Sequence, residues 1–307
     1  MSSIAHRGSL ATRLKLATLR TGFALGGRLA PRRTVERAAR LFATPFASSR
    51  ARARAAEADP SMRQERLVVD GVSIATYVWG DPATQPYVLL VHGWSSFGLR
   101  FRPWVQRLRA LGLAVVSFDQ PGHGLSGGRY CTLPEFADTV RAVGRHYGGA
   151  ELAIGHSLGG AALVLAQDTT WRARRLALIA PAADMDAAAS RYFRFVRLGE
   201  HLRRPFYDWL VARTGVPVEQ LQMHRHAAAL GQPGLVVHDL DDADVPWDEG
   251  ERYARHWPGA RLFTTQGLGH HRVLEAPEVI DAVLAFATGA AVGERVVASP
   301  NLPFGLA

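Results

Sequence analysis

From residue 87 onward, short apolar runs alternate with segments in which apolar residues recur every three or four positions. The apolar runs are typical of buried strands and cover residues 87–91, 114–119, 151–155, 175–181, 234–239 and 260–265. The intervening patterns predict helices near residues 101–112, 133–147, 158–168, 247–256 and 275–287. This alternation predicts an α/β fold with a mostly parallel twisted sheet and helices on both faces. In such sheets, ligands bind at the carboxyl ends of the strands.

Two segments depart from this alternation. Residues 66–79 form two β-rich runs around Asp70-Gly71, which is typical of a hairpin turn. Residues 182–232 contain no clear strand and carry six aromatic residues among arginines: Tyr192, Phe193, Phe195, Phe206, Tyr207 and Trp209. We expect a short helical cap insertion over the carboxyl ends of the strands, with Pro205 and Pro217 separating its helices. Its aromatic side chains either line an apolar pocket or pack the insertion onto the sheet.

The charge of the chain is concentrated at one end. The 307 residues carry a formal net charge of +9, and residues 1–60 account for all of it, with twelve basic residues against three acids. Residues 61–307 are electrically balanced. We therefore divide the chain into a basic, partly helical N-terminal arm (1–60) and a body (61–307). A neutral body implies no basic face, so nucleic acid is not expected as a partner.

The arm is rich in arginine and poor in acids, and residues 10–25 have the spacing of an amphipathic helix. Three interpretations of the arm are open. It could be a membrane-surface anchor or an organellar transit peptide. The third interpretation is a solvated extension or a helix packed on the body. We favour the last interpretation and keep a weak contact of residues 1–60 with a membrane surface as the alternative. No apolar stretch approaches the roughly eighteen residues of a transmembrane helix. We expect a cytoplasmic protein, peripheral to the inner membrane in the alternative case.

A candidate nucleophile follows the third predicted parallel strand. The sequence Gly155-His156-Ser157-Leu158-Gly159 has the G-x-S-x-G pattern and lies between a buried strand and a helix. A sharp turn at this point projects the serine hydroxyl, and the helix N-terminus favours developing negative charge. A serine needs a base that is held in place by an acid.

Acidic and basic candidates follow later strands, in that order. HDLDDADVP (238–246) comes after the strand at 234–239, and GLGHHRV (267–273) comes after the strand at 260–265. We assign His270 as the base because Gly269 lets the loop bend, and we expect His271 to face the following helix. No suitably spaced partners accompany the paired histidines, so neither a metal nor another cofactor is predicted. The single cysteine, Cys131, permits no intramolecular disulfide and is expected to be packed.

Four motifs in this order resemble the α/β-hydrolase fold family, specifically bacterial serine hydrolases, over roughly residues 66–288. They are HGW (92–94), DQPGHGLS (119–126), GHSLGG (155–160), and HDLDDADVP together with GLGHH. The resemblance implies that the backbone N–H groups of Trp94 and Leu158 form an oxyanion hole. It also implies that His92, Asp119 and His123 are architectural, and it assigns no role to His156.

Four aspartates compete for the role of acid in HDLDDADVP. A calcium loop beginning at Asp239 fails, because the required side chains are missing at the fifth, sixth and twelfth positions. A phosphatase that uses Asp239 as nucleophile stays open as a minority interpretation. The family's acid loop often reads H-G-x-x-D-x-x-V-P, and aligning Val245-Pro246 implies that Asp242 is the acid. Asp241 and Asp184 are its rivals, and Asp241 and Asp244 are expected to face water.

The sequence thus predicts a serine hydrolase that acts on a small-molecule carboxylic ester or acyl substrate through an acyl-enzyme. The expected triad is Ser157, Asp242 and His270, with Trp94 and Leu158 as the oxyanion hole and no cofactor. Thioesterase, haloperoxidase-like or acyltransferase chemistry on the same fold remains an alternative. So does a catalytically silent, membrane-associated binding protein, although an intact set of serine, acid and histidine argues against silence.

Overall fold

The computed structural model describes residues 10–57 and 59–296; of the predicted arm and body, residues 1–9, 58 and 297–307 lie outside this description. Its centre is an eight-stranded sheet of order β1-β2-β4-β3-β5-β6-β7-β8. The strands are β1 (Met62–Val69), β2 (Val72–Trp79), β3 (Tyr87–Val91), β4 (Ala114–Phe118), β5 (Leu152–His156), β6 (Leu176–Ile179), β7 (Gly234–Asp239) and β8 (Ala260–Thr265). β2 is antiparallel to both its neighbours, and β3 to β8 run parallel. The predicted fold class is confirmed.

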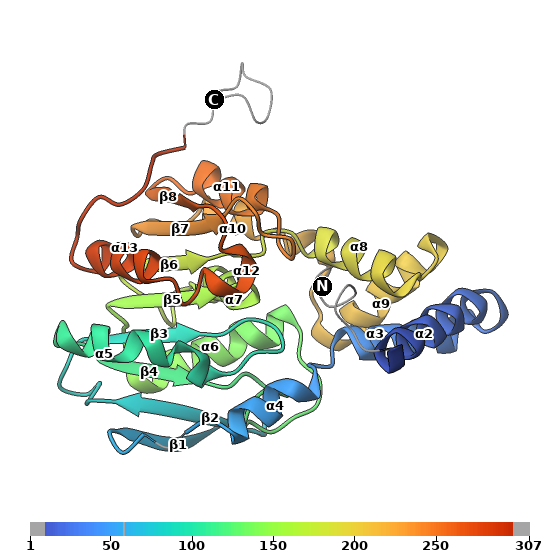
Figure 1. The fold of residues 1–307 in the computed structure, drawn as a ribbon, viewed down its shortest axis with the longest axis horizontal. Helices are drawn as coiled ribbons and strands as arrows, with labels where there is room; N and C mark the ends of the chain where they lie inside the picture. The colour runs from blue at the N-terminus through green and yellow to red at the C-terminus, as the bar shows by residue number, and fades with distance from the viewer. Residues whose placement is uncertain (1–9, 58, 297–307) are drawn as a thin grey trace.

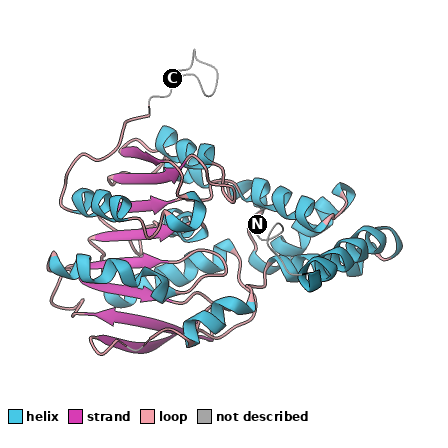
Figure 2. Cartoon of the chain, in the orientation of Figure 1, coloured by secondary structure: helices cyan, strands magenta, loops and turns pink. Residues whose placement is uncertain are grey.

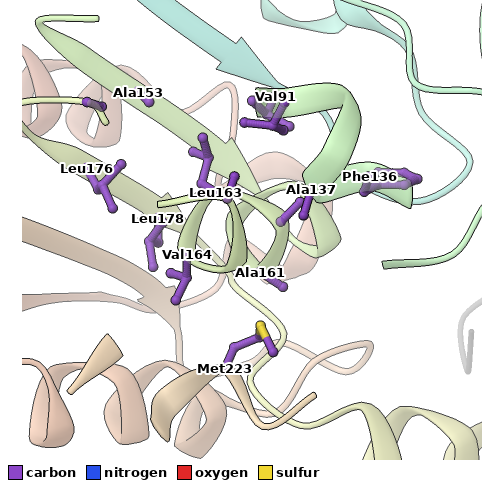
Figure 3. Close-up of a cluster of buried hydrophobic side chains, with 14 of the residues drawn as sticks. Val91, Phe136, Ala137, Ala153, Ala161, Leu163, Val164, Leu176, Leu178 and Met223 are labelled. Carbon is purple, nitrogen blue, oxygen red and sulfur yellow. The ribbon is translucent and has the colours of Figure 1, made fainter. Parts of the chain in front are cut away.

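Helices cover both faces of the sheet (Figures 1 and 2). One face carries η1 (Gly98–Phe101), α5 (Arg102–Ala110) and α13 (Pro277–Ala287). The other carries α6 (Leu133–Tyr147), α7 (Leu158–Ala166), α10 (Met223–Ala227) and α11 (Trp247–His256). Alternate residues of one strand serve the two cores: Leu89 belongs to the α7 side and Leu90 to the α5 side. Figure 3 shows how Leu163 and Val164 of α7 pack with Leu178 of β6.

The predicted hairpin is present at the edge of the sheet. β1 and β2 pair antiparallel through Val69 and Val72. The two residues between them, Asp70 and Gly71, have φ values of 47° and 77°. Positive φ at both central residues is the requirement of the tight turn that matches strand twist.

The insertion after β6 is helical and lies beyond the carboxyl ends of the strands (Figure 1). It contains α8 (Met185–Val196), η2 (Glu200–Leu202), α9 (Arg203–Thr214) and η3 (Val218–Gln220). Pro217 follows α9 as expected, but the expectation for Pro205 is wrong. Pro205 lies in the first turn of α9, where a missing N–H costs no helical hydrogen bond. α8 ends instead at Val196, and the capping residue Arg197 has a left-handed φ of 58°.

The arm forms three helices: α2 (Leu10–Leu29), α3 (Pro31–Phe42) and α4 (Ala47–Arg54). Figure 1 shows α2 and α3 beside α8 and α9. Between them lies a buried cluster that includes Phe23 and Ala38 of the arm together with Tyr192, Phe193 and Phe206 of the insertion. The insertion's aromatic residues therefore pack largely on the arm instead of on the sheet. No helix among the described residues is long and apolar enough to cross a membrane.

Candidate active site

Ser157 lies at the turn between β5 and α7 and adopts a strained backbone conformation. Its φ of 55° and ψ of −123° are unfavourable for a residue with a side chain. The turn is so tight that its two glycine positions have no room for a Cβ. A Cβ on Gly155 would lie 2.7 Å from backbone atoms of Gly159 and Gly160, and one on Gly159 would collide with the carbonyl oxygen of Val91. The two glycines thus permit the close strand–helix approach that directs the serine hydroxyl toward His270.

His270 connects the serine to an acid. Its Nε2 lies 3.0 Å from Ser157 Oγ, and its Nδ1 lies 2.7 Å from Asp242 Oδ2. The carboxylate accepts the Nδ1 proton, which leaves Nε2 free to accept the serine proton. Gly269, with a φ of 64°, begins the short helix α12 (Gly269–Arg272), which carries the histidine into this position.

Asp242 is held in its ionised form. Burial opposes ionisation, but hydrogen bonds from His238 and His270 and from the N–H of Val245 outweigh it and keep the pKa of Asp242 well below its usual value. Its Oδ1 accepts the N–H groups of Asp244 and Val245 at 2.9 and 2.8 Å. One oxygen is thus fixed by the loop while the other faces the imidazole.

The predicted oxyanion donors flank the nucleophile. Leu158 is the first residue of α7, where backbone N–H groups lack intrahelical acceptors. Trp94 follows Gly93, and a Cβ on Gly93 would lie 2.9 Å from the Ser157 Cβ. The loop after β3 therefore passes close to the nucleophile.

Comparisons with known proteins agree with this architecture. Residues 82–229 match the family model described as serine aminopeptidase, S33. An esterase from Pyrococcus furiosus superposes with a TM-score of 0.56 at 20% identity, over 76% of this chain and 96% of that one. The chain therefore has the α/β-hydrolase fold. A thioesterase domain from the curacin biosynthetic pathway also superposes, with a TM-score of 0.52 at 19% identity, over 74% of this chain and 98% of that domain.

Two curated relatives of this chain have assigned activities. It is 37% identical to a monoacylglycerol lipase of Mycolicibacterium smegmatis over 102 residues, which cover 30% of this chain and 36% of the relative. It is 28% identical to a pimeloyl-[acyl-carrier protein] methyl ester esterase of Xanthomonas campestris over 246 residues, which cover 66% of this chain and 94% of that protein. The chain thus spans about a third of the first relative and nearly all of the second.

The residues expected to be architectural support the loop after β3. His92 is buried; its Nε2 accepts the Gln120 N–H at 3.0 Å. His123 accepts the N–H of Ser95, the residue after Trp94, at 3.1 Å. Asp119 accepts hydrogen bonds from the Gly98 N–H and the Tyr77 hydroxyl. These side chains hold the loops after β3 and β4 together.

Asp239 has a structural role that the local sequence does not reveal. It is fully buried at the end of β7. Its carboxylate accepts hydrogen bonds from Gly269 N at 2.8 Å, Leu268 N at 3.1 Å and the Thr265 hydroxyl at 2.8 Å. Burial opposes ionisation, but these bonds lower its pKa. Asp239 therefore anchors the loop that carries His270, and its burial disfavours its use as a phosphatase nucleophile.

The other acids take separate positions. Asp184 caps α8 by accepting the N–H groups of Asp186 and Ala187. Asp241 is exposed as expected and accepts the Gly267 N–H at 3.0 Å. The expectation that Asp244 faces water is wrong, because its side chain is only 18% exposed and lies in the cavity wall beside His271.

The neighbouring histidines also differ from expectation. His271 does not face the following helix; it lines the cavity, with Nε2 3.6 Å from Asp244 Oδ2. His156, which had no assigned role, is buried, and its Nε2–H donates to the His270 carbonyl at 2.9 Å. Burial lowers the pKa of His156 well below its usual value, so the ring stays neutral. No local pattern indicates this contact, because 114 positions separate the two residues.

A cavity of about 1200 Å³ opens onto Ser157 and His270. Residues from the arm, the insertion and the loops of the body line it together. Cys131 is one of them; it is buried, and burial raises the pKa of its thiol, so it is no reactive thiolate. The described part of the chain contains no group of three or more metal-binding side chains that could hold an ion.

Proposed function

We propose that this α/β-hydrolase is a serine esterase that cleaves carboxylic esters through an acyl-enzyme. The observation that carries this proposal is the continuous hydrogen-bonded series from Ser157 through His270 to Asp242. That arrangement activates a serine for attack on an acyl carbon.

Acylation begins when Ser157 Oγ attacks the ester carbonyl carbon and His270 Nε2 takes the hydroxyl proton. The carbonyl oxygen becomes an oxyanion, which the N–H groups of Trp94 and Leu158 stabilise. Asp242 stabilises the imidazolium that forms and keeps Nε2 directed at the reaction. The tetrahedral intermediate then breaks its bond to the alkoxy oxygen, and His270 gives its proton to the departing alcohol.

Deacylation repeats these steps with water. His270 takes a proton from water as the water oxygen attacks the acyl-enzyme carbonyl carbon. The second tetrahedral intermediate releases the acid as its bond to Ser157 Oγ breaks, and His270 returns the proton to the serine.

An ester fits the cavity better than a peptide with a free amino end. Among the described lining residues there are five arginines, and Asp244 is the single acid. Recognition of an ammonium group requires carboxylates instead. The two curated relatives act on esters, which supports the same class. Thioester hydrolysis and acyl transfer need the same machinery and remain alternatives within this fold.

A panel of p-nitrophenyl and thioester substrates tests the proposal. We expect ester turnover to fall by about 10⁶-fold in Ser157→Ala. Ser190→Ala should retain activity, because Ser190 does not line the cavity. Full activity in Ser157→Ala would exclude the mechanism. Magnesium-dependent phosphatase activity that is lost in Asp239→Asn would instead support a phosphatase that uses Asp239 as its nucleophile.

We also propose a peripheral membrane contact through the outer face of α2. Leu14, Leu25 and Leu29 are 60%, 53% and 84% exposed. At 3.6 residues per turn they share one face, about opposite to the buried Phe23. Arg13, Lys15 and Arg28 are exposed beside them and complement anionic lipid.

Vesicle sedimentation tests the membrane contact. We expect the protein to pellet with vesicles that contain phosphatidylglycerol, and Leu25→Ser/Leu29→Ser to pellet less. Val68→Ser is the matched control, because Val68 is 77% exposed but lies on β1, away from the arm. Equal sedimentation of the three proteins would exclude this face as the contact.

A further inference from the structure

The cavity above Ser157 has a wall that lies outside the matched family segment, which covers residues 82–229. Leu19, Leu41, Phe42 and Phe46 of the arm line it. The cavity is also lined by Phe195 and Leu210 of the insertion, which lie within the matched segment. The substrate space is therefore enclosed by two groups of helices from separate parts of the sequence.

The arm is fixed to the insertion by specific contacts. The centroid of the Phe42 ring lies 5.0 Å from the centroid of the Tyr192 ring and 5.4 Å from that of the Phe206 ring. The Tyr192 hydroxyl donates to the Ala38 carbonyl at 2.8 Å, and Arg20 Nε donates to the Phe195 carbonyl at 2.7 Å. These contacts join α2 and α3 of the arm to α8 and α9 of the insertion.

The segment after α3 connects the same arm to the body. The Cys131 N–H donates to the Ala43 carbonyl at 2.9 Å, and the Phe46 N–H donates to Ser95 Oγ at 2.9 Å. Ser95 directly follows Trp94, and both residues line the cavity. The arm therefore extends from the insertion down to the loop beside the nucleophile.

We propose that α2, α3 and residues 43–46 form the second half of the substrate chamber, and that its occupant is the long hydrocarbon chain of an ester. This proposal rests on the proposed esterase function. The volume of about 1200 Å³ exceeds the roughly 300–1,000 Å³ of pockets for drug-sized ligands. Leucine and phenylalanine residues from both halves line it. Each methylene buried there improves binding by about fourfold.

Substitution at Leu41 tests the chamber directly. Leu41 is 38% exposed and lines the cavity near the end of α3, so a larger side chain shortens the space without replacing a buried core residue. The matched control is Leu29→Trp, because Leu29 belongs to the same arm but is 84% exposed and does not line the cavity. Leu41→Ala has a smaller side chain and enlarges the space instead of shortening it.

The readout is kcat/KM for two ester series. One keeps p-nitrophenol and varies the acyl chain from acetate through butyrate and octanoate to dodecanoate. The other keeps acetate and varies the alcohol chain over the same lengths. We expect Leu41→Trp to lose about tenfold or more on the long members of one series, and less than about twofold on its short members. The affected series identifies whether the acyl or the alcohol chain enters the chamber.

The control and the smaller variant complete the test. Leu29→Trp should follow the unmodified protein at every length, and Leu41→Ala should retain the long esters. Parallel length profiles for Leu41→Trp and the unmodified protein in both series would overturn the chamber proposal while leaving the esterase intact. Absence of Ser157-dependent turnover of the short esters would instead reject the proposed function.

Discussion

At the scale of single residues, the aspartates after β7 differ in what they contact. Asp242 accepts from the His270 ring, Asp239 accepts from the backbone beside that histidine, and Asp241 is exposed. A carboxylate beside the ring orients it and stabilises its charged form. A carboxylate that holds the backbone acts only through the position of the ring.

This difference predicts the effects of two isosteric changes. Asp242→Asn should reduce kcat by about 10⁴-fold, because the amide cannot stabilise the imidazolium and favours the wrong tautomer. Asp241→Asn should change kcat by no more than a few fold, because Asp241 lies in solvent. Steady-state kinetics on a short ester distinguishes them. A large loss in Asp241→Asn with little loss in Asp242→Asn would reverse the assignment.

Asp239→Asn should give an intermediate result. The asparagine side chain has one acceptor oxygen and one NH₂ group. Its NH₂ group therefore faces the backbone N–H of either Leu268 or Gly269, and that donor is left unpaired in a buried site. The free energy of unfolding should fall by about 1–3 kcal/mol. We expect kcat to fall while KM stays nearly constant, because the ring loses its position and the chamber does not change. Urea unfolding and kinetics on the same sample check both effects.

At the scale of elements, helix α4 holds the loop that carries Trp94. Arg52 Nη2 donates to the Ser95 carbonyl at 2.9 Å, and the guanidinium lies over the Phe97 ring. Ser95 has a positive φ of 53°, which is an unfavourable conformation that its surroundings must maintain. The arm thus contributes to the geometry of the proposed oxyanion hole.

Arg52→Gln should therefore reduce kcat more than it changes KM. We expect a loss of about tenfold, smaller than the 10²–10³-fold loss typical when an oxyanion donor itself is removed. Arg52→Lys should restore part of the activity, because an ammonium can still donate to the carbonyl. Arg54→Gln is the control, since Arg54 is an exposed arginine of the same helix. Equal kinetics for Arg52→Gln and Arg54→Gln would contradict this role.

Local patterns predicted the elements but not the contacts between distant ones. The strands and the serine turn follow from apolar runs and from glycine spacing, which are local properties. Ala38, Phe42 and Tyr192 meet only after the arm folds back over the insertion, across about 150 positions, so their pairing has no local signal. Asp239 likewise reveals its role only when β7 and β8 bring two loops together.

At the scale of the whole molecule, three buried histidines link folding to pH. Burial lowers the pKa values of His92, His123 and His156 below 6.5. The charged and titratable groups that face them are Asp119 for His92, Arg50 and His92 for His123, and His270, His271 and Arg100 for His156. In the folded protein the three rings therefore bind protons at a lower pH than in the unfolded chain, where they bind protons near pH 6.5.

The unfolded state therefore binds more protons below about pH 6.5, and stability should decrease as the pH falls from that value. Each histidine contributes a slope of at most about 1.4 kcal/mol per pH unit. Asp239 and Asp242 have lowered pKa values, so the stability that they contribute is lost only below about pH 4. Urea unfolding between pH 7.5 and pH 4.5 separates the two contributions. We expect the slope to be smaller in His156→Gln, whose amide can still donate to the His270 carbonyl; a flat profile over this range would show that the three histidines do not govern acid stability.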